Sequence, residues 1–133
     1  MKMGRDHIVP LSRQASAVLE SLPRTSAYVL PMQKDDGRPM AANTVADAIR
    51  KLGFEHTAHG FRATARTILD EVLNQKVDLI EHQLAHAVKD ANGRAYNRTT
   101  HLPARKDMMQ VWADYLDRIR MGGIAIQLPT RAA

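Results

Sequence analysis

The sequence predicts a mainly α-helical fold with a small β-hairpin at its amino terminus. Apolar residues recur at helical spacing in several segments, which are separated by clusters of Gly, Pro, Asp and Asn. Gly4 suits a hairpin turn within an extended stretch that ends at Leu11. With 133 residues, 44% apolar and 25% charged, the chain has the size and composition of one globular domain. We expect this domain over residues 1–123 and a tail over 124–133.

Five helices are predicted after the extended segment Lys2–Leu11. Each starts at a residue that suits a helix N-terminus or ends near Gly or Pro, and each carries apolar residues three or four apart. A short apolar run over 28–30 is a strand or an extended connection, and residues 31–40 hold a turn. The predicted helices are Ser12–Leu22, Asn43–Leu52, Gly60–Leu73, Val77–His86 and one from Leu102 to Gly122, in which Met109, Trp112, Leu116 and Ile119 form the buried stripe.

The chain is basic, with a net charge of +5 and a pI near 9.9. This charge is compatible with a nucleic acid, an anionic membrane or an acidic protein as partner. Basic residues gather around Tyr96, which favours nucleic acid, although a solvated loop has the same composition. The chain has no cysteine, which excludes disulfides and cysteine-ligated zinc. The basic residues of this segment are Lys89, Arg94, Arg98, Arg105 and Lys106.

No apolar run reaches the ~20 residues that cross a bilayer, and the amino terminus has no apolar core of a secretory signal. We therefore expect no membrane partner and a cytoplasmic location. The chain enters an extended segment directly at its amino terminus, from which we expect it to be part of a longer protein.

Four polar residues, His59, Arg62, His86 and Tyr96, are suited to chemistry on a phosphodiester. Phenol has a pKa of about 10, so a tyrosine nucleophile needs a partner that accepts its proton. Arginine stabilises the negative charge of the transition state, and the leaving oxygen takes a proton from lysine or histidine. Lys2 can supply that proton, and the scheme needs no metal or other cofactor.

Each of these residues also has a structural interpretation. Tyr96 is one of three tyrosines, and Arg62 suits a surface ion pair with Glu55 or Asp70. His82 and His86, four residues apart, suit a zinc site, but the sequence marks no third ligand. No glycine-rich phosphate-binding fingerprint is present.

The joint pattern resembles the tyrosine recombinases, the phage integrase family. His59–Arg62 resembles their His-x-x-Arg motif, and Leu84–His86 resembles their Leu-Gly-His motif with alanine in place of glycine. Tyr96 follows the second histidine by ten residues, where the nucleophile of the family lies. The similarity is closest to prophage and satellite-phage integrases, and it extends from Lys2 to about Arg120.

The resemblance implies the helical fold of the DNA breaking-rejoining catalytic domain and a role for each matched residue. Tyr96 attacks the scissile phosphate and forms a 3′-phosphotyrosyl link. Arg62 binds the non-bridging oxygens and His86 donates to the phosphate, while His59 assists proton transfer from the tyrosine. Lys2 matches the hairpin lysine that protonates the leaving oxygen. The partner is double-stranded DNA, with self-association into a tetramer in the parent enzyme, and the predicted DNA contacts are Lys89, Arg94, Arg98 and Arg66.

The chain departs from the family pattern in one respect. The family uses a second arginine upstream of the hairpin lysine, and an amino-terminal domain that clamps DNA, and neither is in this sequence. Losing one phosphate donor typically lowers the rate by about 10²–10³. We therefore expect the parent protein to carry out site-specific recombination and this chain alone to be nearly inactive. The alternatives are a non-catalytic DNA-binding fragment and a histidine-ligated zinc hydrolase.

Overall fold

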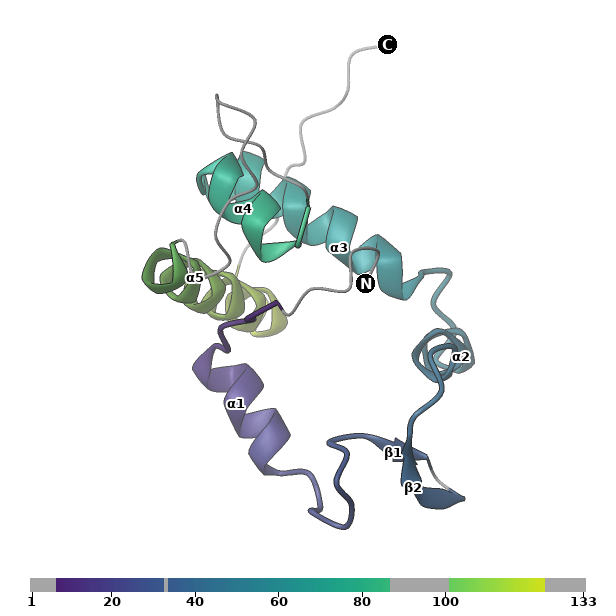
Figure 1. Cartoon of the computed structure of the whole chain (residues 1–133). Helices are drawn as coiled ribbons and strands as arrows, with labels where there is room; N and C mark the ends of the chain where they lie inside the picture. Colours follow the sequence, from purple (N-terminus) through teal and green to yellow (C-terminus); the bar gives the residue numbers. More distant parts are fainter. Residues whose placement is uncertain (1–6, 33, 87–100, 124–133) are drawn as a thin grey trace.

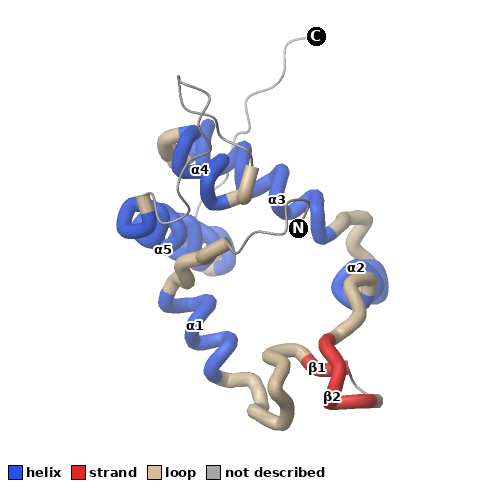
Figure 2. Tube along the Cα trace, in the orientation of Figure 1, coloured by secondary structure: helices blue, strands red, loops and turns tan. Residues whose placement is uncertain are grey.

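The computed structural model of the chain describes residues 7–32, 34–86 and 101–123. The fold is mainly α-helical with a small antiparallel hairpin, which confirms the predicted fold class (Figures 1 and 2). The elements in chain order are α1 (Arg13–Glu20), β1 (Pro31–Met32), β2 (Asp35–Pro39), α2 (Thr44–Lys51), α3 (Ala58–Thr67), the π-helix η1 (Ile68–Val72), α4 (Val77–Gln83) and α5 (Leu102–Arg120).

The core lies where η1, α4 and α5 meet. Leu69, Ile80 and Met108 are almost wholly buried there, one from each of these elements. Partly buried apolar side chains surround them, and α3 joins the core because it continues directly into η1. The helix predicted over Gly60–Leu73 is therefore present, but its last turns have π geometry. The surrounding side chains are Leu73, Leu79, Leu84, Met109 and Trp112.

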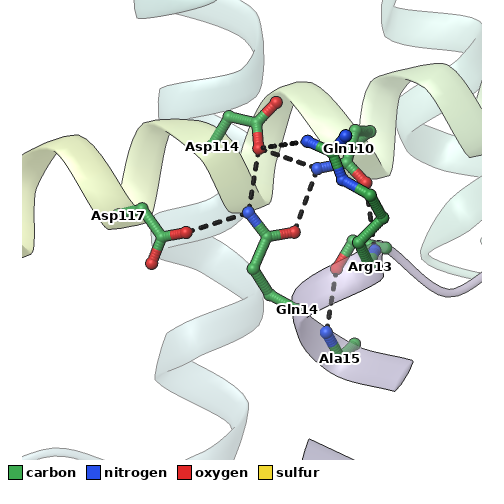
Figure 3. A network of polar contacts seen from close by, with 7 residues as sticks. Arg13, Gln14, Ala15, Gln110, Asp114 and Asp117 are labelled. Carbon is green, nitrogen blue, oxygen red and sulfur yellow. Dashed lines mark hydrogen bonds and ion pairs between the residues drawn. The ribbon is translucent and has the colours of Figure 1, made fainter. Parts of the chain in front are cut away.

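The first helix begins where the sequence predicts, because Ser12 accepts a hydrogen bond from the backbone N–H of Ala15 at 3.2 Å. This helix packs on α5 through polar groups (Figure 3). The Gln14 amide donates to Asp114 at 2.8 Å and to Asp117 at 2.9 Å, while Gln110 donates to Gln14 at 2.9 Å. The hydrogen bonds from the two glutamines lower the pKa of Asp114, so its carboxylate remains an acceptor.

The hairpin occupies a different place from the one predicted. Strands β1 and β2 pair antiparallel, with Pro31 opposite Pro39, near α2 and away from the core (Figure 1). The described part of the predicted amino-terminal strand, residues 7–11, forms no strand. The Ile8 carbonyl instead accepts a hydrogen bond from the Arg105 side chain at 2.6 Å, and Pro10 has no N–H to offer a neighbouring strand. The predicted turn at Gly4 lies outside the described residues.

The buried face of α5 also differs from the prediction. Leu116 is 44% exposed and Ile119 is 36% exposed, whereas Arg105, Met108 and Tyr115 are buried. The buried stripe therefore runs through Arg105, Met108 and Tyr115, and α5 meets α1 through polar contacts of Gln110 and Asp114.

Two other apolar residues that share the helical spacing of their segments are exposed. Phe61 in the first part of α3 is 54% exposed, and Val77 at the start of α4 is 43% exposed. Both precede the part of their helix that reaches the core at Leu69 and Ile80. None of the described helices is both long and apolar enough to span a membrane.

Candidate active site

Two segments that are far apart in sequence meet between α3 and α4. Thr57 caps α3 by accepting a hydrogen bond from the Gly60 N–H at 2.9 Å, which places His59 and Arg62 in the first two turns. The Arg62 guanidinium Nη2 donates to the backbone carbonyl of Leu84, the residue that ends α4. The helix that carries His59 and Arg62 is therefore joined directly to the turn that carries His86.

That turn has the geometry of a Schellman motif. The backbone N–H of His86 donates to the Glu81 carbonyl at 3.0 Å, and the Ala85 N–H donates to the His82 carbonyl at 3.1 Å. Ala85 has a φ of +54°, a left-handed conformation that glycine adopts without the steric cost of a Cβ. The reversal of the chain at Ala85 directs His86 back toward the last turns of α4.

The His86 ring is held by Glu81. Its Nδ1 forms a hydrogen bond with Oε2 of Glu81, while Oε1 of the same carboxylate accepts from Arg66 Nε at 2.8 Å. Arg66 also pairs with Asp70 at 3.7 Å. Burial taken alone raises the pKa of Glu81, but the hydrogen bonds and charges of His86 and Arg66 outweigh it and lower that pKa. Glu81 is therefore an ionised carboxylate between two donors.

The candidate catalytic side chains lie at the surface. His59 and Arg62 are exposed, and the His86 side chain is 49% exposed. No hydrogen bond or ion pair joins the His59 side chain to another described residue. Such an arrangement suits a large substrate that lies across the surface better than a small molecule, which is normally enclosed.

The start of α3 is supported by His56. Its ring packs edge-on against Phe61, with the ring centroids 4.4 Å apart, and it covers Gly60 so closely that a Cβ there would lie 2.7 Å from the ring. His56 also lines an open cavity of about 500 Å³, and Arg50 and Phe54 contribute to its wall. His59, Arg62 and His86 do not line this cavity, so it is separate from the site between α3 and α4.

The two histidines proposed as zinc ligands have different surroundings. His86 bonds to Glu81, whereas the His82 ring lies 5.9 Å from the ring of His101 and its pKa is lowered by burial. Across residues 7–32, 34–86 and 101–123, no three His, Asp or Glu side chains are grouped so that they could hold a metal ion.

Only some of the predicted site residues lie among the residues that the structure describes. The proposed ion pair of Arg62 with Asp70 is absent, since Arg62 bonds to the Leu84 carbonyl and Asp70 pairs with Arg66. Arg66, predicted to contact DNA, is engaged by two carboxylates, and its DNA contact stays a prediction. Five other predicted site residues lie outside the described residues, namely Lys2, Lys89, Arg94, Tyr96 and Arg98.

Sequence reasoning did not identify two residues that hold the site together. Glu81 bridges Arg66 and His86, and Arg105 is buried against Gln83, the neighbour of Leu84. Glu81 lies fifteen residues from Arg66, a separation with no periodic signal in the sequence. Arg105 belongs to a basic segment, which suggested an exposed position.

Comparison with known proteins connects the chain to a family. It is 41% identical to the integrase of Enterobacteria phage P4, over 96% of this chain and 31% of that protein. It is 40% identical to prophage integrase IntA of Escherichia coli (strain K12), over 95% of this chain and 32% of IntA. The integrase of Shigella phage Sf6 is 37% identical over 88% of this chain and 32% of that integrase.

The chain spans about a third of the length of these curated relatives. No protein-family model matches it, and no solved structure gives a significant match. The identities of about 40% extend over nearly all of its residues, including both segments that meet at Leu84. The chain therefore belongs to the family of phage and prophage integrases.

Proposed function

We propose that the chain carries the strand-cleaving residues of a site-specific DNA recombinase that acts through a tyrosine. The observation that carries this proposal is the hydrogen bond from Arg62 to the Leu84 carbonyl, because it joins the helix of the first motif to the turn of the second. An arginine and two histidines from these segments then share one exposed region between α3 and α4. This combination suits a phosphodiester in double-stranded DNA.

Each residue has a defined part in the cleavage step. The hydroxyl oxygen of Tyr96 attacks the scissile phosphorus, a new P–O bond forms, and the bond from phosphorus to the 5′-oxygen breaks. His59 accepts the phenol proton, and Lys2 gives a proton to the leaving 5′-oxygen. Strand rejoining is the reverse reaction, in which a 5′-hydroxyl attacks the phosphotyrosine, so no outside energy source is consumed.

Arg62 and His86 stabilise the phosphate during this step. The guanidinium has five N–H donors, and the bond to Leu84 uses one of them, so other donors are available to the non-bridging oxygens. The Nδ1 atom of His86 is bound to Glu81, which leaves Nε2 for the phosphate. Both groups are held before DNA arrives, which is the condition for strong electrostatic stabilisation of a transition state.

We further propose that basic residues beside Tyr96 bind the DNA backbone and that the recombinase assembles as a tetramer on its sites. The proposed backbone contacts are Lys89, Arg94, Arg98 and Arg66.

A covalent-adduct assay tests the proposal. The chain replaces the matching third of the phage P4 integrase, and the hybrid protein is mixed with a duplex that carries the recombination site of that integrase and a nick beside the scissile phosphate. The nick lets the cleaved end diffuse away and so traps the phosphotyrosyl intermediate. We expect a protein–DNA adduct that resists boiling in detergent and that the Tyr96→Phe hybrid does not form.

Matched variants separate catalysis from binding. Arg62→Lys keeps the charge but loses the planar fork, so we expect adduct formation to fall by about 10²–10³ while DNA affinity changes little. Tyr28→Phe removes a phenol that is placed elsewhere and should leave the adduct unchanged. An adduct that survives Tyr96→Phe would disprove the nucleophile assignment. A hybrid that binds DNA but forms no adduct would identify the chain as a DNA-binding module without chemistry.

A further inference from the structure

The side chain of Glu81 connects α3, α4 and the turn after α4. Its two carboxylate oxygens contact different partners, Arg66 Nε at 2.8 Å and His86 Nδ1. The Glu81 side chain is 21% exposed, whereas those of Arg66 and His86 are 43% and 49% exposed. The carboxylate is therefore the most shielded member of this group of three.

His86 is attached to Glu81 twice. Besides the contact of its ring, its backbone N–H donates to the Glu81 carbonyl at 3.0 Å. The left-handed Ala85 makes the second attachment possible, because it reverses the chain immediately after Leu84. A surface ion pair between two flexible side chains has no such backbone restraint and contributes little.

We propose that Glu81 is a positioning residue for the reaction: it accepts the Nδ1–H of His86 and thereby keeps Nε2 directed at the DNA phosphate. Arg66 fixes the other carboxylate oxygen, so the carboxylate cannot rotate away from the ring. This inference rests on the proposed function for the identity of the substrate, but the Glu81–His86 contact itself is independent of it.

The chemistry of imidazole gives the reason for this arrangement. A ring nitrogen donates to a phosphate oxygen only when it carries a proton, and the partner of the other nitrogen decides which tautomer is present. A carboxylate at Nδ1 keeps a proton there and balances the positive charge when both nitrogens are protonated. Nε2 therefore donates to the phosphate from the doubly protonated ring, whose positive charge Glu81 balances. Without Glu81, the ring loses both this balance and its fixed direction.

NMR of the full chain can test the protonation and hydrogen bonding of the His86 ring. In a long-range ¹H–¹⁵N spectrum of the histidine rings, we expect a protonated, hydrogen-bonded Nδ1 for His86. Glu81→Gln should remove this signature, because the amide pairs poorly with Arg66 and has no charge to hold the proton. The matched control is Asp70→Asn, which removes the other carboxylate beside Arg66 but does not contact His86. A His86 ring protonated at Nε2 alone, or one that Glu81→Gln leaves unchanged, would overturn the proposal.

The cleavage rate of the hybrid integrase tests whether Glu81 contributes to the reaction. We expect Glu81→Gln to lower the cleavage rate about tenfold to a hundredfold without weakening DNA binding, the range found for carboxylates that orient ligand histidines. In a His86→Ala background the same substitution should have no further effect, since its target is gone. An equal loss in both backgrounds would show a general structural role and overturn the proposal. If the unsubstituted hybrid forms no adduct, the proposed function fails, while the NMR result still decides whether Glu81 positions His86.

Discussion

Replacing Arg105 by methionine tests how a buried guanidinium contributes to the fold. Arg105 is 1% exposed, and burial lowers its pKa, yet arginine remains charged in proteins. No carboxylate of the described residues pairs with it. It donates instead to Gln83 Oε1 at 3.0 Å and to the Ile8 carbonyl at 2.6 Å. These bonds attach the extended segment before α1 to the end of α4.

The expected effect is the difference between two opposing contributions. Each acceptor left without its donor costs about 1–3 kcal/mol if water does not reach it. Methionine has a similar length and removes a buried charge, which recovers part of the desolvation penalty. Ile8 is 46% exposed as a residue, so water partly restores the lost bond at its carbonyl. We expect Arg105→Met to lower the free energy of unfolding by about 2 kcal/mol.

The assay is urea unfolding of the full chain, followed by fluorescence and far-UV circular dichroism. Trp112 is the only tryptophan and lies on α5 beside the core, so its fluorescence reports on the helix that carries Arg105. Lys106→Met is the matched control, because it removes the same charge from the exposed neighbouring residue and should change stability by less than about 0.5 kcal/mol.

A second variant identifies the source of the effect. Arg105→Lys keeps the charge but cannot reach both acceptors, and its ammonium group is more strongly hydrated, so it should destabilise at least as much as methionine. If Arg105→Met is as stable as the unchanged chain or more stable, desolvation outweighs the lost hydrogen bonds and the reasoning is refuted.

Three other predictions concern the site. Ala85→Gly should raise the thermal midpoint, with a gain of up to about 1 kcal/mol, because glycine has no steric cost at a φ of +54°; a lower midpoint would contradict this explanation. The pKa of Glu81 is lower in the folded chain, so the ionised carboxylate stabilises the fold fully above the unfolded pKa of about 4.3, and this stabilisation is lost as the pH falls through the folded pKa. On acidification, the Glu81→Gln variant should therefore lose less stability than the unchanged chain. Equal losses would argue against the pairing of Glu81 with Arg66 and His86. DNA affinity measured by fluorescence anisotropy should fall steeply with salt, and each alanine substitution at Lys89, Arg94 or Arg98 should reduce the slope of log K against log salt by about one; an unchanged slope would remove that residue from the interface.

Local signals predicted some of the helix ends, although Asn43 before α2 makes no capping bond and α4 ends at Gln83 rather than at His86. Ser12 caps α1 through its side chain, and Gly53 follows α2 with a φ of +82°, as a residue after a helix end requires. These features depend on a few neighbouring residues, so the sequence carries them directly. Arg62 and Arg66 are four residues apart, which places them on one face of α3, and their side chains contact Leu84 and Glu81.

Features that depend on distant partners could not be predicted in the same way. The face that α5 buries depends on which helices pack against it, and α5 contacts Gln14 of α1 through polar side chains that the apolar spacing does not reveal. The segment around Ile8 resembles a strand, with a polar start followed by the apolar run Ile8–Leu11, but the Ile8 carbonyl bonds to Arg105, 97 residues away. Glu81 lies between Arg66 and His86 only in the folded chain, so its role has no local signal in the sequence.

The π-helix η1 has a consequence for how the lengths of related chains can vary. In a π-helix each backbone bond spans five residues, as from the Leu73 N–H to the Ile68 carbonyl at 2.9 Å, so this turn contains one residue more than an α-helix needs. A relative that lacks one residue between Ile68 and Val72 can close the turn as regular α-helix and keep its core. The same deletion inside α3 would rotate Arg62 relative to Arg66 by about 100° and separate one of them from α4. When related integrases are aligned over α3 and η1, single-residue gaps should therefore fall within η1 and be absent from α3.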